Sequence, residues 1–202
     1  MSPDGKILGR VERYLAGLPA GLDSFPECMA KGALVRNLLE REVVHVLLPK
    51  LPEPLRALAE DPPIGSEWIP EVHFGSLLLA VADARGLDDD GLLAWTRDRN
   101  RSLFRSPAYR ILMSVASPAH LLRFAGARWG NWHRNSTLKI KRIADEGVRA
   151  ALRFPPTLFD GALAAVYGEA FTATLEIARA SAPRVQVVTE EPGLVRYLAS
   201  WE

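Results

Sequence analysis

Residues 137–154, TLKIKRIADEGVRAALRF, decide the fold expected for this chain. Apolar and basic residues alternate through 138–141, and Val148, Ala150 and Leu152 alternate with Arg149, Ala151 and Arg153. This is the period of a strand with one buried face. Residues 144–147, Ala-Asp-Glu-Gly, have the composition of a tight turn between them. The stretch therefore predicts a β-hairpin whose outer face is basic.

The sequence after this hairpin predicts a long helix and then a second hairpin. A proline pair ends the first hairpin, and Thr157 with Asp160 three residues later is the expected N-cap of a helix over 158–180. Residues 184–188 and 194–201 alternate again across a Glu-Pro-Gly turn. The C-terminal third is thus predicted as strand, strand, helix, strand, strand.

The residues before the first hairpin predict helices. Apolar residues recur there at helical spacing in segments that end at glycine or proline. These segments are 7–18, 34–47, 72–84, 88 to about 107, and 118 to about 134. Five prolines in residues 49–63 predict a stiff connector around a short turn at 55–58.

Together these patterns predict an α+β fold in a single domain over residues 1–202. An N-terminal helical portion, 1–135, is expected to pack on a C-terminal four-stranded antiparallel sheet. That sheet, in ββαββ order within 136–202, carries one long crossing helix. A length of 202 residues allows one good-sized domain or two small ones, and we expect one cooperative unit.

The composition is that of a globular protein of a reducing compartment. Hydrophobic residues make up 48% and charged residues 24%, which excludes a disordered or coiled-coil chain. The single cysteine, Cys28, excludes a disulfide framework and a cysteine-based zinc or iron–sulfur site. No apolar run is long enough for a membrane span or a signal peptide. We expect a cytoplasmic protein with no membrane partner.

The near-neutral net charge of +1 hides an uneven distribution. Residues 97–153 hold thirteen Lys or Arg and three acids, whereas the rest of the chain holds twelve basic and twenty-one acidic residues. Either the two sets pair on folding, or the segment forms a basic face for a nucleic acid, a nucleotide or an acidic protein. The residues of that expected basic face are Arg97, Arg101, Arg105, Lys139, Lys141, Arg149 and Arg153.

No motif in the sequence predicts catalysis, a metal or a bound cofactor. Glu42-x-x-His45 has the spacing of a di-iron motif, but that site needs the motif twice. No serine lies in a Gly-x-Ser-x-Gly elbow, and no glycine-rich nucleotide fingerprint occurs. We predict no catalytic residue and no metal site; an enzyme of specialised metabolism is kept as a lesser alternative.

Several short motifs occur together with this order of elements. They are Trp68-Ile69-Pro70-Glu71, Ser117-Pro118, Arg128-Trp129 with His133, the hairpin 138–154, Phe154-Pro155 leading to Phe159-Asp160-Gly161, and Tyr197-Leu198-Ala199-Ser200-Trp201. With them the chain resembles a family of uncharacterised myxobacterial proteins of about this length. That family is similar in architecture to the haem nitric-oxide-binding and vinyl-reductase sensor domains. The resemblance implies a helical half folded over an antiparallel sheet, and small-molecule sensing or binding.

The leading functional hypothesis is a non-catalytic small-molecule-binding or signalling module. Its pocket is expected between the helical portion and the sheet, with an apolar lining and few polar contacts. The expected ligand-binding residues are Trp129, Trp132, Phe159, Tyr167 and Phe171, with Arg128 and His133 as the polar contacts. Ordinary core packing is the alternative for each of them. The ligand's identity stays open, and a homodimer is compatible with a sensor of this kind.

The sequence departs from the haem-binding members of the wider group. Those members carry a Tyr-x-Ser-x-Arg motif for the haem propionates, and that spacing does not occur here. His120 and His133 are the histidines considered as axial ligands, and both are better read as ordinary helix or core residues. We therefore expect no haem and no other cofactor.

Overall fold

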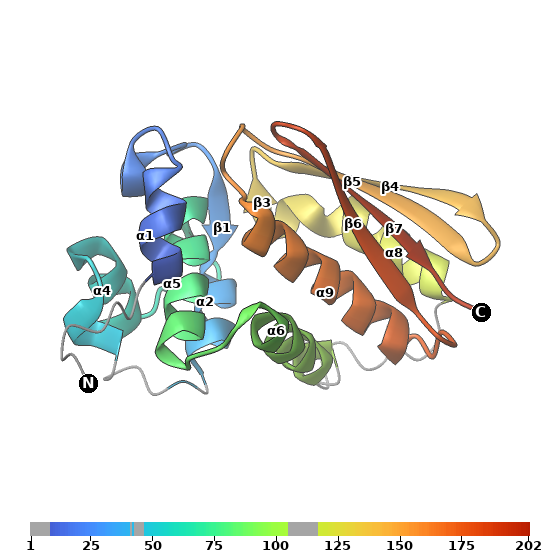
Figure 1. Cartoon of the computed structure of the whole chain (residues 1–202), viewed down its shortest axis with the longest axis horizontal. Helices are drawn as coiled ribbons and strands as arrows, with labels where there is room; N and C mark the ends of the chain where they lie inside the picture. Colours follow the sequence, from blue (N-terminus) through green and yellow to red (C-terminus); the bar gives the residue numbers. More distant parts are fainter. Residues whose placement is uncertain (1–8, 41, 43–46, 105–116) are drawn as a thin grey trace. The chain divides into compact units, whose positions relative to one another are not determined.

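The computed structural model describes residues 9–40, 42, 47–104 and 117–202 (Figure 1). The chain divides into two compact units. The first comprises Met1–Leu87 with Asn131–Asn135, and the second comprises Asp88–Gly130 with Ser136–Glu202. The chain therefore leaves the second unit for five residues and then returns to it. The single cooperative domain expected over 1–202 stays a prediction.

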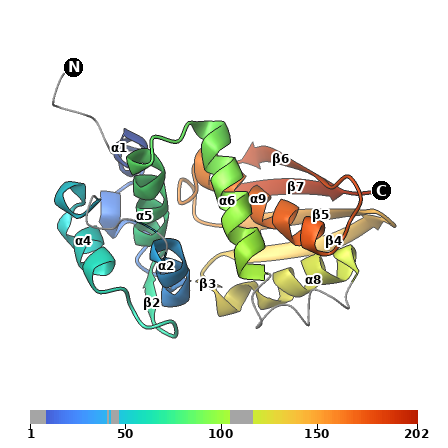
Figure 2. The ribbon, with the colours of Figure 1, turned by 90° about the horizontal axis from the view of Figure 1, so that it is seen from below.

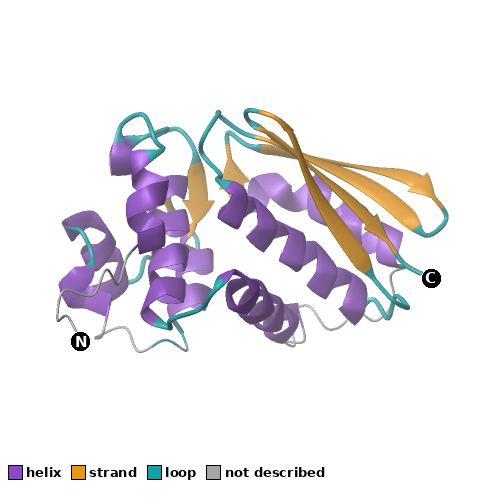
Figure 3. Cartoon of the chain, viewed as in Figure 1, coloured by secondary structure: helices purple, strands orange, loops and turns teal. Residues whose placement is uncertain are grey.

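The first unit consists of short helices and a small sheet (Figure 3). The helices among its described residues are α1 (Gly9–Ala16), α2 (Gly32–Leu39), α4 (Glu53–Glu60) and α5 (Glu71–Ala84), with 3-10 turns η1 (Gly21–Asp23) and η2 (Leu48–Lys50). Its antiparallel strands, in the order β2-β1-β3, are β1 (Met29–Lys31), β2 (Trp68–Pro70) and β3 (His133–Arg134). These strands are too short to show a period of two, so the sequence did not predict them.

Helix α5 forms the centre of the first unit. It is apolar on all sides, and Val72, Leu77 and Leu79 are completely buried, as expected for a helix surrounded by other elements. The ion pair between Arg10 and Asp83, 3.0 Å long, fastens α1 to α5. The core of this unit therefore lies around α5.

The proline-rich connector contains a helix, which corrects the expected short turn at 55–58. Helix α4 begins at Glu53, with Pro54 in its first turn, where a missing backbone N–H costs nothing and the fixed φ angle is already helical. Leu55 and Ala59 are buried, with exposed fractions of 0% and 4%. Their burial explains why eight residues between prolines fold as a helix.

The described residues of the second unit form the larger sheet and the helices that pack with it (Figure 3). The strands are β4 (Thr137–Ala144), β5 (Gly147–Arg153), β6 (Arg184–Glu191) and β7 (Leu194–Ser200). The helices are α6 (Asp89–Phe104), α8 (Pro118–Arg128) and α9 (Gly161–Ile177), and the turn η3 (Trp129–Asn131) follows α8. All strand pairs are antiparallel and the order is β4-β5-β7-β6. The predicted α+β class and ββαββ sheet are confirmed.

Helices α8 and α9 cover one face of this sheet. A Cβ atom at Gly168 of α9 would lie 3.0 Å from Val187 of β6, so the helix backbone approaches the strands closely there. The Tyr197 hydroxyl donates a 2.9 Å hydrogen bond from β7 to the Ala164 carbonyl of α9. Helix α6 packs on α9 on the side away from the sheet (Figures 1 and 2). The unit thus has three layers, and the other sheet face is uncovered by them.

The structure corrects several predicted helix boundaries. Asp160, not Thr157, caps α9: its carboxylate accepts a 2.8 Å hydrogen bond from Leu163 N, while Thr157 has a φ of 72°. Helix α8 ends at Arg128 instead of running to about residue 134, because the next residues form η3 and β3. Asp88 accepts a 2.7 Å hydrogen bond from Gly91 N and so caps α6.

Some expectations fall on residues that the structure does not describe. Helix α2 ends at Leu39, and residues 41 and 43–46 of the helix expected over 34–47 lie outside the described residues. The same is true of residues 105–116, which include Arg105. None of the helices in the described part of the chain combines the length and hydropathy needed to span a bilayer.

Candidate ligand-binding site

Four aromatic rings of the second unit form a continuous row, called here the aromatic cluster: Trp129, Tyr167, Phe159 and Phe154. The ring centroids of Trp129 and Tyr167 are 5.5 Å apart, those of Tyr167 and Phe159 5.1 Å, and those of Phe159 and Phe154 4.7 Å. The Trp129–Tyr167 and Tyr167–Phe159 pairs, inclined by 65° and 63°, have the edge-to-face geometry that aromatic pairs favour, and the Phe159–Phe154 pair is tilted by 58°. Phe159 is buried, and the other three are half-buried.

Each ring of the cluster comes from the end of an element or from one helix face. Trp129 follows the last residue of α8, and Phe154 follows the last residue of β5. Phe159 precedes the capping residue Asp160, whose hydrogen bond fixes the start of α9. Tyr167 lies about two turns into that helix. The sequence analysis named three of the four as ligand-binding residues; Phe154 was part of the hairpin and of the Phe154-Pro155 motif, and was not expected to bind a ligand.

The cluster has a polar group at one end. The Trp129 indole N–H donates a 2.9 Å hydrogen bond to the Ser136 hydroxyl, and Ser136 is buried with 7% exposure. Half-buried rings with one fixed polar partner provide a surface for an apolar or aromatic molecule. Ser136 was not among the expected site residues, since nothing in the sequence pairs it with Trp129.

The structure places two of the expected ligand-binding residues away from the cluster but in the same unit. Phe171 is buried and contacts Tyr197 edge-to-face, with centroids 4.9 Å apart. Burial raises the pKa of Tyr197, which fits a hydroxyl inside the helix–sheet core. The exposed Arg128 guanidinium lies over the Phe124 ring at 5.0 Å.

The other two expected ligand-binding residues, Trp132 and His133, belong to the first unit. His133 is paired with Glu71: the imidazole Nδ1 and a carboxylate oxygen are 2.8 Å apart, and the residues are 4% and 2% exposed. Glu71 begins α5, and its backbone N–H donates a 2.8 Å hydrogen bond to the Cys28 carbonyl. Glu71 and His133 are 62 positions apart in the sequence, so their pairing could not be predicted from it.

Cys28 is close to this pair and is not a reactive thiol. It is 1% exposed, and its Sγ lies 3.7 Å from the Asn135 carbonyl oxygen. Burial, together with the nearby carboxylates of Glu27 and Glu71, raises the pKa of the Cys28 thiol to about 11. A thiol with that pKa stays protonated at neutral pH and is a poor nucleophile.

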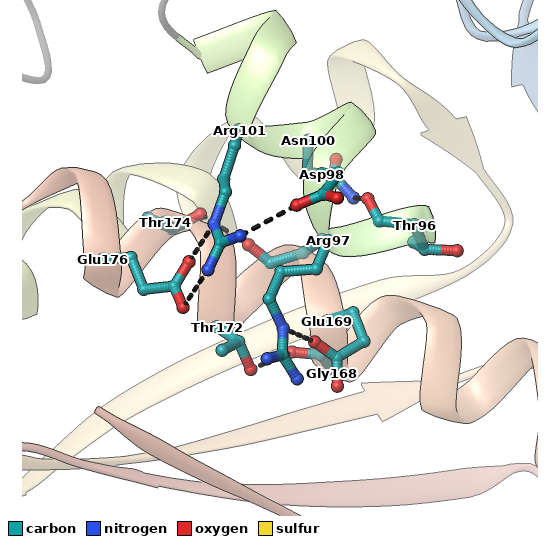
Figure 4. Close-up of polar contacts among 11 residues, drawn as sticks. Thr96, Arg97, Asp98, Asn100, Arg101, Gly168, Glu169, Thr172, Thr174 and Glu176 are labelled. Atoms are coloured by element: carbon teal, nitrogen blue, oxygen red, sulfur yellow. Dashed lines mark hydrogen bonds and ion pairs between the residues drawn. The ribbon is translucent and has the colours of Figure 1, made fainter. Parts of the chain in front are cut away.

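Two arginines of the expected basic face are paired with glutamates. Arg97 contacts Glu169 at 2.5 Å, and Arg101 holds Glu176 through two hydrogen bonds of 2.5 and 2.6 Å (Figure 4). These hydrogen bonds raise the pKa of both guanidinium groups. Asp98 adds a contact to Arg101 at 2.8 Å. These ion pairs connect α6 to α9. Glu169 and Glu176 therefore neutralise the charge of the two arginines.

Arg105 lies outside the described residues, and the other four residues of the expected basic face, Lys139, Lys141, Arg149 and Arg153, lie on the sheet. In the β4–β5 register Lys141 is opposite Arg149, Lys139 is opposite Ala151, and Thr137 is opposite Arg153. Side chains directly opposite share one face, so the register puts all four cations on the face away from α8 and α9. All four are exposed.

The described residues hold no group of three or more His, Cys, Asp or Glu side chains suited to a metal ion. The Glu42-x-x-His45 spacing falls partly on a residue outside the description, because His45 is not described.

The fold is that of H-NOX domains, as expected from the resemblance to haem nitric-oxide-binding sensors. An oxygen-binding H-NOX domain related to soluble guanylate cyclases, in its oxygen complex, is 12% identical, with a TM-score of 0.58 over 85% of this chain and 92% of that chain. The Fe(II) unliganded H-NOX protein from K. algicida is 12% identical, with a TM-score of 0.60 over 85% and 96%. A structure that addresses H-NOX activation is 12% identical, with a TM-score of 0.55 over 85% and 94%.

At these identities the similarity shows the fold alone. No family model matches the sequence, and no curated protein matches it. The expected membership in a myxobacterial family therefore stays a prediction.

Proposed function

We propose that the chain is a non-catalytic signalling module of the H-NOX fold that binds a small apolar or aromatic molecule at the aromatic cluster. The observation that carries the proposal is the row of Trp129, Tyr167 and Phe159, in which two rings stay half-buried beside a fixed polar partner. Partly exposed rings in a preformed arrangement bind apolar ligands with little loss of side-chain entropy.

The connection between this cluster and the first unit supports a signalling role. Trp129 and Ser136 are on either side of residues 130–135, and Asn131–Asn135 of that segment belongs to the first unit as β3 and its flanks. A ligand that displaces the Trp129 ring would strain its hydrogen bond to Ser136 and so act on the ends of this segment. Binding in one unit would thereby be coupled to the other through the chain itself.

Haem is the ligand to consider first, because one of the similar structures concerns haem redox potential. The donor set described here does not fit a haem at the aromatic cluster. His120, the one described histidine of the second unit, is exposed on α8. His73 and His133 belong to the first unit, where burial lowers the pKa of His73 and Glu71 occupies a ring nitrogen of His133. The propionate motif Tyr-x-Ser-x-Arg is missing from the sequence. We therefore derive the function without haem.

Native mass spectrometry of the purified protein, with an absorbance spectrum of the same sample, tests this proposal. We expect a co-purified small molecule and no haem absorption. The Tyr167→Leu variant removes one ring of the cluster but keeps apolar volume, so it should lose that molecule. The matched control Phe124→Leu removes an exposed ring on α8 and should keep it.

A second measurement covers the case in which the ligand is lost on purification. Saturation-transfer NMR with indole as the probe should show contact with the wild-type protein and with Phe124→Leu, and weaker contact with Tyr167→Leu. The proposal is wrong if no molecule co-purifies and indole shows no transfer, or if Tyr167→Leu behaves as the wild type. A haem absorption band would overturn the haem-free assignment.

A further inference from the structure

The uncovered face of the large sheet has a small residue surrounded by cations. Ala151 of β5 is opposite Lys139 of β4 on one side and opposite Arg196 of β7 on the other. Arg149 and Arg153 are two residues away in β5 itself, on the same face. Four cationic side chains therefore start from positions next to one methyl group, which we call the Ala151 centre.

The geometry of a sheet sets the size of this centre. Directly opposite residues have Cβ atoms about 4.5–5.5 Å apart, and residues two apart in a strand are separated by about 7 Å. Long Lys and Arg side chains reach farther than these spacings, so their charged ends can meet over Ala151. Ala151 and Arg196 are half-buried, and Lys139, Arg149 and Arg153 are exposed.

Among the described side chains, the ion pair found on this face is weaker than the ion pairs that hold α6. Glu191 is 3.7 Å from Arg153, and both side chains are more than half exposed, at 56% and 58%, which makes a weak ion pair. Arg142, which is opposite the buried Val148 and so does not belong to this face, is paired with Asp145 at the turn of the hairpin. Arg196 has further contacts of its own. By contrast, Arg97 and Arg101 are held by glutamates of α9 at 2.5 Å.

The cations are also arranged at a cost to the fold. Lys141 is directly opposite Arg149 in the register, and like charges in that relation destabilise a sheet. An anion bound beside Arg149 would reduce this repulsion.

The chemistry of the face favours one class of anion. The outward positions of the four strands carry no aromatic residue in the sequence, so the stacking that single-stranded nucleic acids require is not provided. Arginine forks bind phosphate oxygens in pairs, and lysine adds a point charge. The small side chain of Ala151 leaves room for a compact group between them.

We infer that the Ala151 centre binds a multiply charged phosphate group through Lys139, Arg149, Arg153 and Arg196. The inference does not depend on the aromatic cluster or on the molecule proposed to bind there. It concerns the phosphate group itself, whether a soluble phosphorylated compound or a lipid headgroup carries it.

Isothermal titration calorimetry with sodium pyrophosphate tests the inference on the full chain. We expect saturable binding at low salt that weakens as salt rises, because phosphate contacts release counterions. Ala151→Glu puts a carboxylate among the cations and should weaken binding by about tenfold or more. Ala151→Gln has nearly the same size without the charge and serves as the matched control, so its binding should be much less affected.

A second pair of variants covers the case in which Ala151→Glu does not fold. Arg149→Gln removes one cation of the centre and should weaken pyrophosphate binding, whereas Arg142→Gln removes a cation paired at the hairpin turn and should not. The inference is overturned if the wild type shows no saturable binding at low salt. It is also overturned if Ala151→Glu binds as well as Ala151→Gln, or Arg149→Gln as well as Arg142→Gln.

Vesicle flotation distinguishes the two sources of the phosphate. Phosphatidylcholine vesicles with and without phosphatidic acid are mixed with the wild type and with Ala151→Glu. Flotation that needs phosphatidic acid, is displaced by pyrophosphate and is lost in Ala151→Glu assigns the centre to a lipid headgroup. Calorimetric binding of pyrophosphate without flotation assigns it to a soluble phosphorylated compound.

Discussion

The indole of Trp129 and the hydroxyl of Ser136 are joined by a 2.9 Å hydrogen bond, although the segment between them belongs to the other unit of the chain. In that unit, His133 and Arg134 pair with β1. The backbone N–H of Lys31 donates a 2.9 Å hydrogen bond to the Trp132 carbonyl, which adds to the pairing. The polar end of the aromatic cluster is therefore formed by Trp129 and Ser136, the two residues on either side of the segment that contributes β3 to the first unit.

Replacing Ser136 by Ala should destabilise the protein by about 1 kcal/mol, because the half-buried indole N–H loses this acceptor. Urea unfolding followed by tryptophan fluorescence measures the change. Ser200→Ala, at an exposed position of β7, is the control and should leave the unfolding midpoint nearly unchanged. Equal midpoints for the two variants would show that the Trp129–Ser136 contact contributes nothing.

Replacing Glu71 by Ala should cost about 3 kcal/mol or more, since it leaves the buried His133 ring without its carboxylate partner. Glu71→Gln keeps an acceptor of similar shape and should cost much less. Glu12→Ala, which removes an exposed glutamate of α1 in the same unit, should have little effect. The three free energies of unfolding from denaturant titration decide the matter; a Glu71→Ala value near that of Glu12→Ala would contradict a stabilising pair.

The Cys28 thiol should react slowly with iodoacetamide in the folded protein at pH 8 and rapidly in urea. Burial and two nearby carboxylates raise its pKa from 9.0 to about 11, so the thiolate is scarce at that pH. The same shift makes a stability prediction. The folded state holds the proton more tightly than the unfolded state, so this contribution is fully present below pH 9 and falls as the pH rises from 9 to about 11.

Comparing the wild type with Cys28→Ala isolates this contribution from other groups that titrate in alkali. The wild type should lose more stability than the variant between the two pH values. A thiol that reacts equally fast in folded and unfolded protein, or identical pH profiles for the two proteins, would show that the thiol is not shielded.

Replacing Arg101 by Met should destabilise the α6–α9 contact by at most about 1 kcal/mol, because the side chains of Arg101 and Glu176 are 34% and 24% exposed and the solvent screens them. The loss should shrink at high salt, which screens the wild-type pair as well. Arg142→Met removes a more exposed pair, with side chains 54% and 90% exposed, and should cost less. Thermal unfolding at low and high salt measures both; a salt-independent loss would point to packing instead of charge.

The parts of the fold that follow a local period could be predicted from the sequence. Alternation in 137–154 predicted the β4–β5 hairpin, and the register indeed puts Lys141 opposite Arg149. Helical spacing likewise predicted α5 and α9, with errors at their ends. The end of α8 was misplaced because residues 133–134 pair with β1, about a hundred positions earlier in the chain, and propensity carries no information about that pairing.

The candidate site was harder to predict, since it depends on contacts between distant residues. Aromatic side chains were visible in the sequence, but the arrangement that joins Trp129 to Tyr167 and separates Phe171 is a product of tertiary packing. The pairing of Arg97 with Glu169 was likewise hidden, although the unequal charge of the two parts of the chain allowed for it.

Replacing Gly193 by Ala should cost about 3 kcal/mol or more and should disturb the aromatic cluster. Gly193 has a φ of 79°, and a Cβ there would lie 2.5 Å from the Phe154 carbonyl oxygen, so the substitution adds a backbone clash to the strain of a left-handed residue. Gly86→Ala is the matched control. Its φ is 65°, but nothing lies within 4 Å of the added Cβ, so its cost should stay near the roughly 1–2 kcal/mol of the conformation alone.

Denaturant unfolding gives both free energies, and indole binding by saturation transfer gives the effect on the cluster. Phe154 also donates its backbone N–H to the Gly193 carbonyl at 2.9 Å, so strain at Gly193 acts directly on the residue that carries the last ring of the row. Gly193→Ala should therefore weaken indole binding while Gly86→Ala should not. If both variants lose the same stability and bind indole alike, the close approach of Gly193 to Phe154 has no role in holding the cluster.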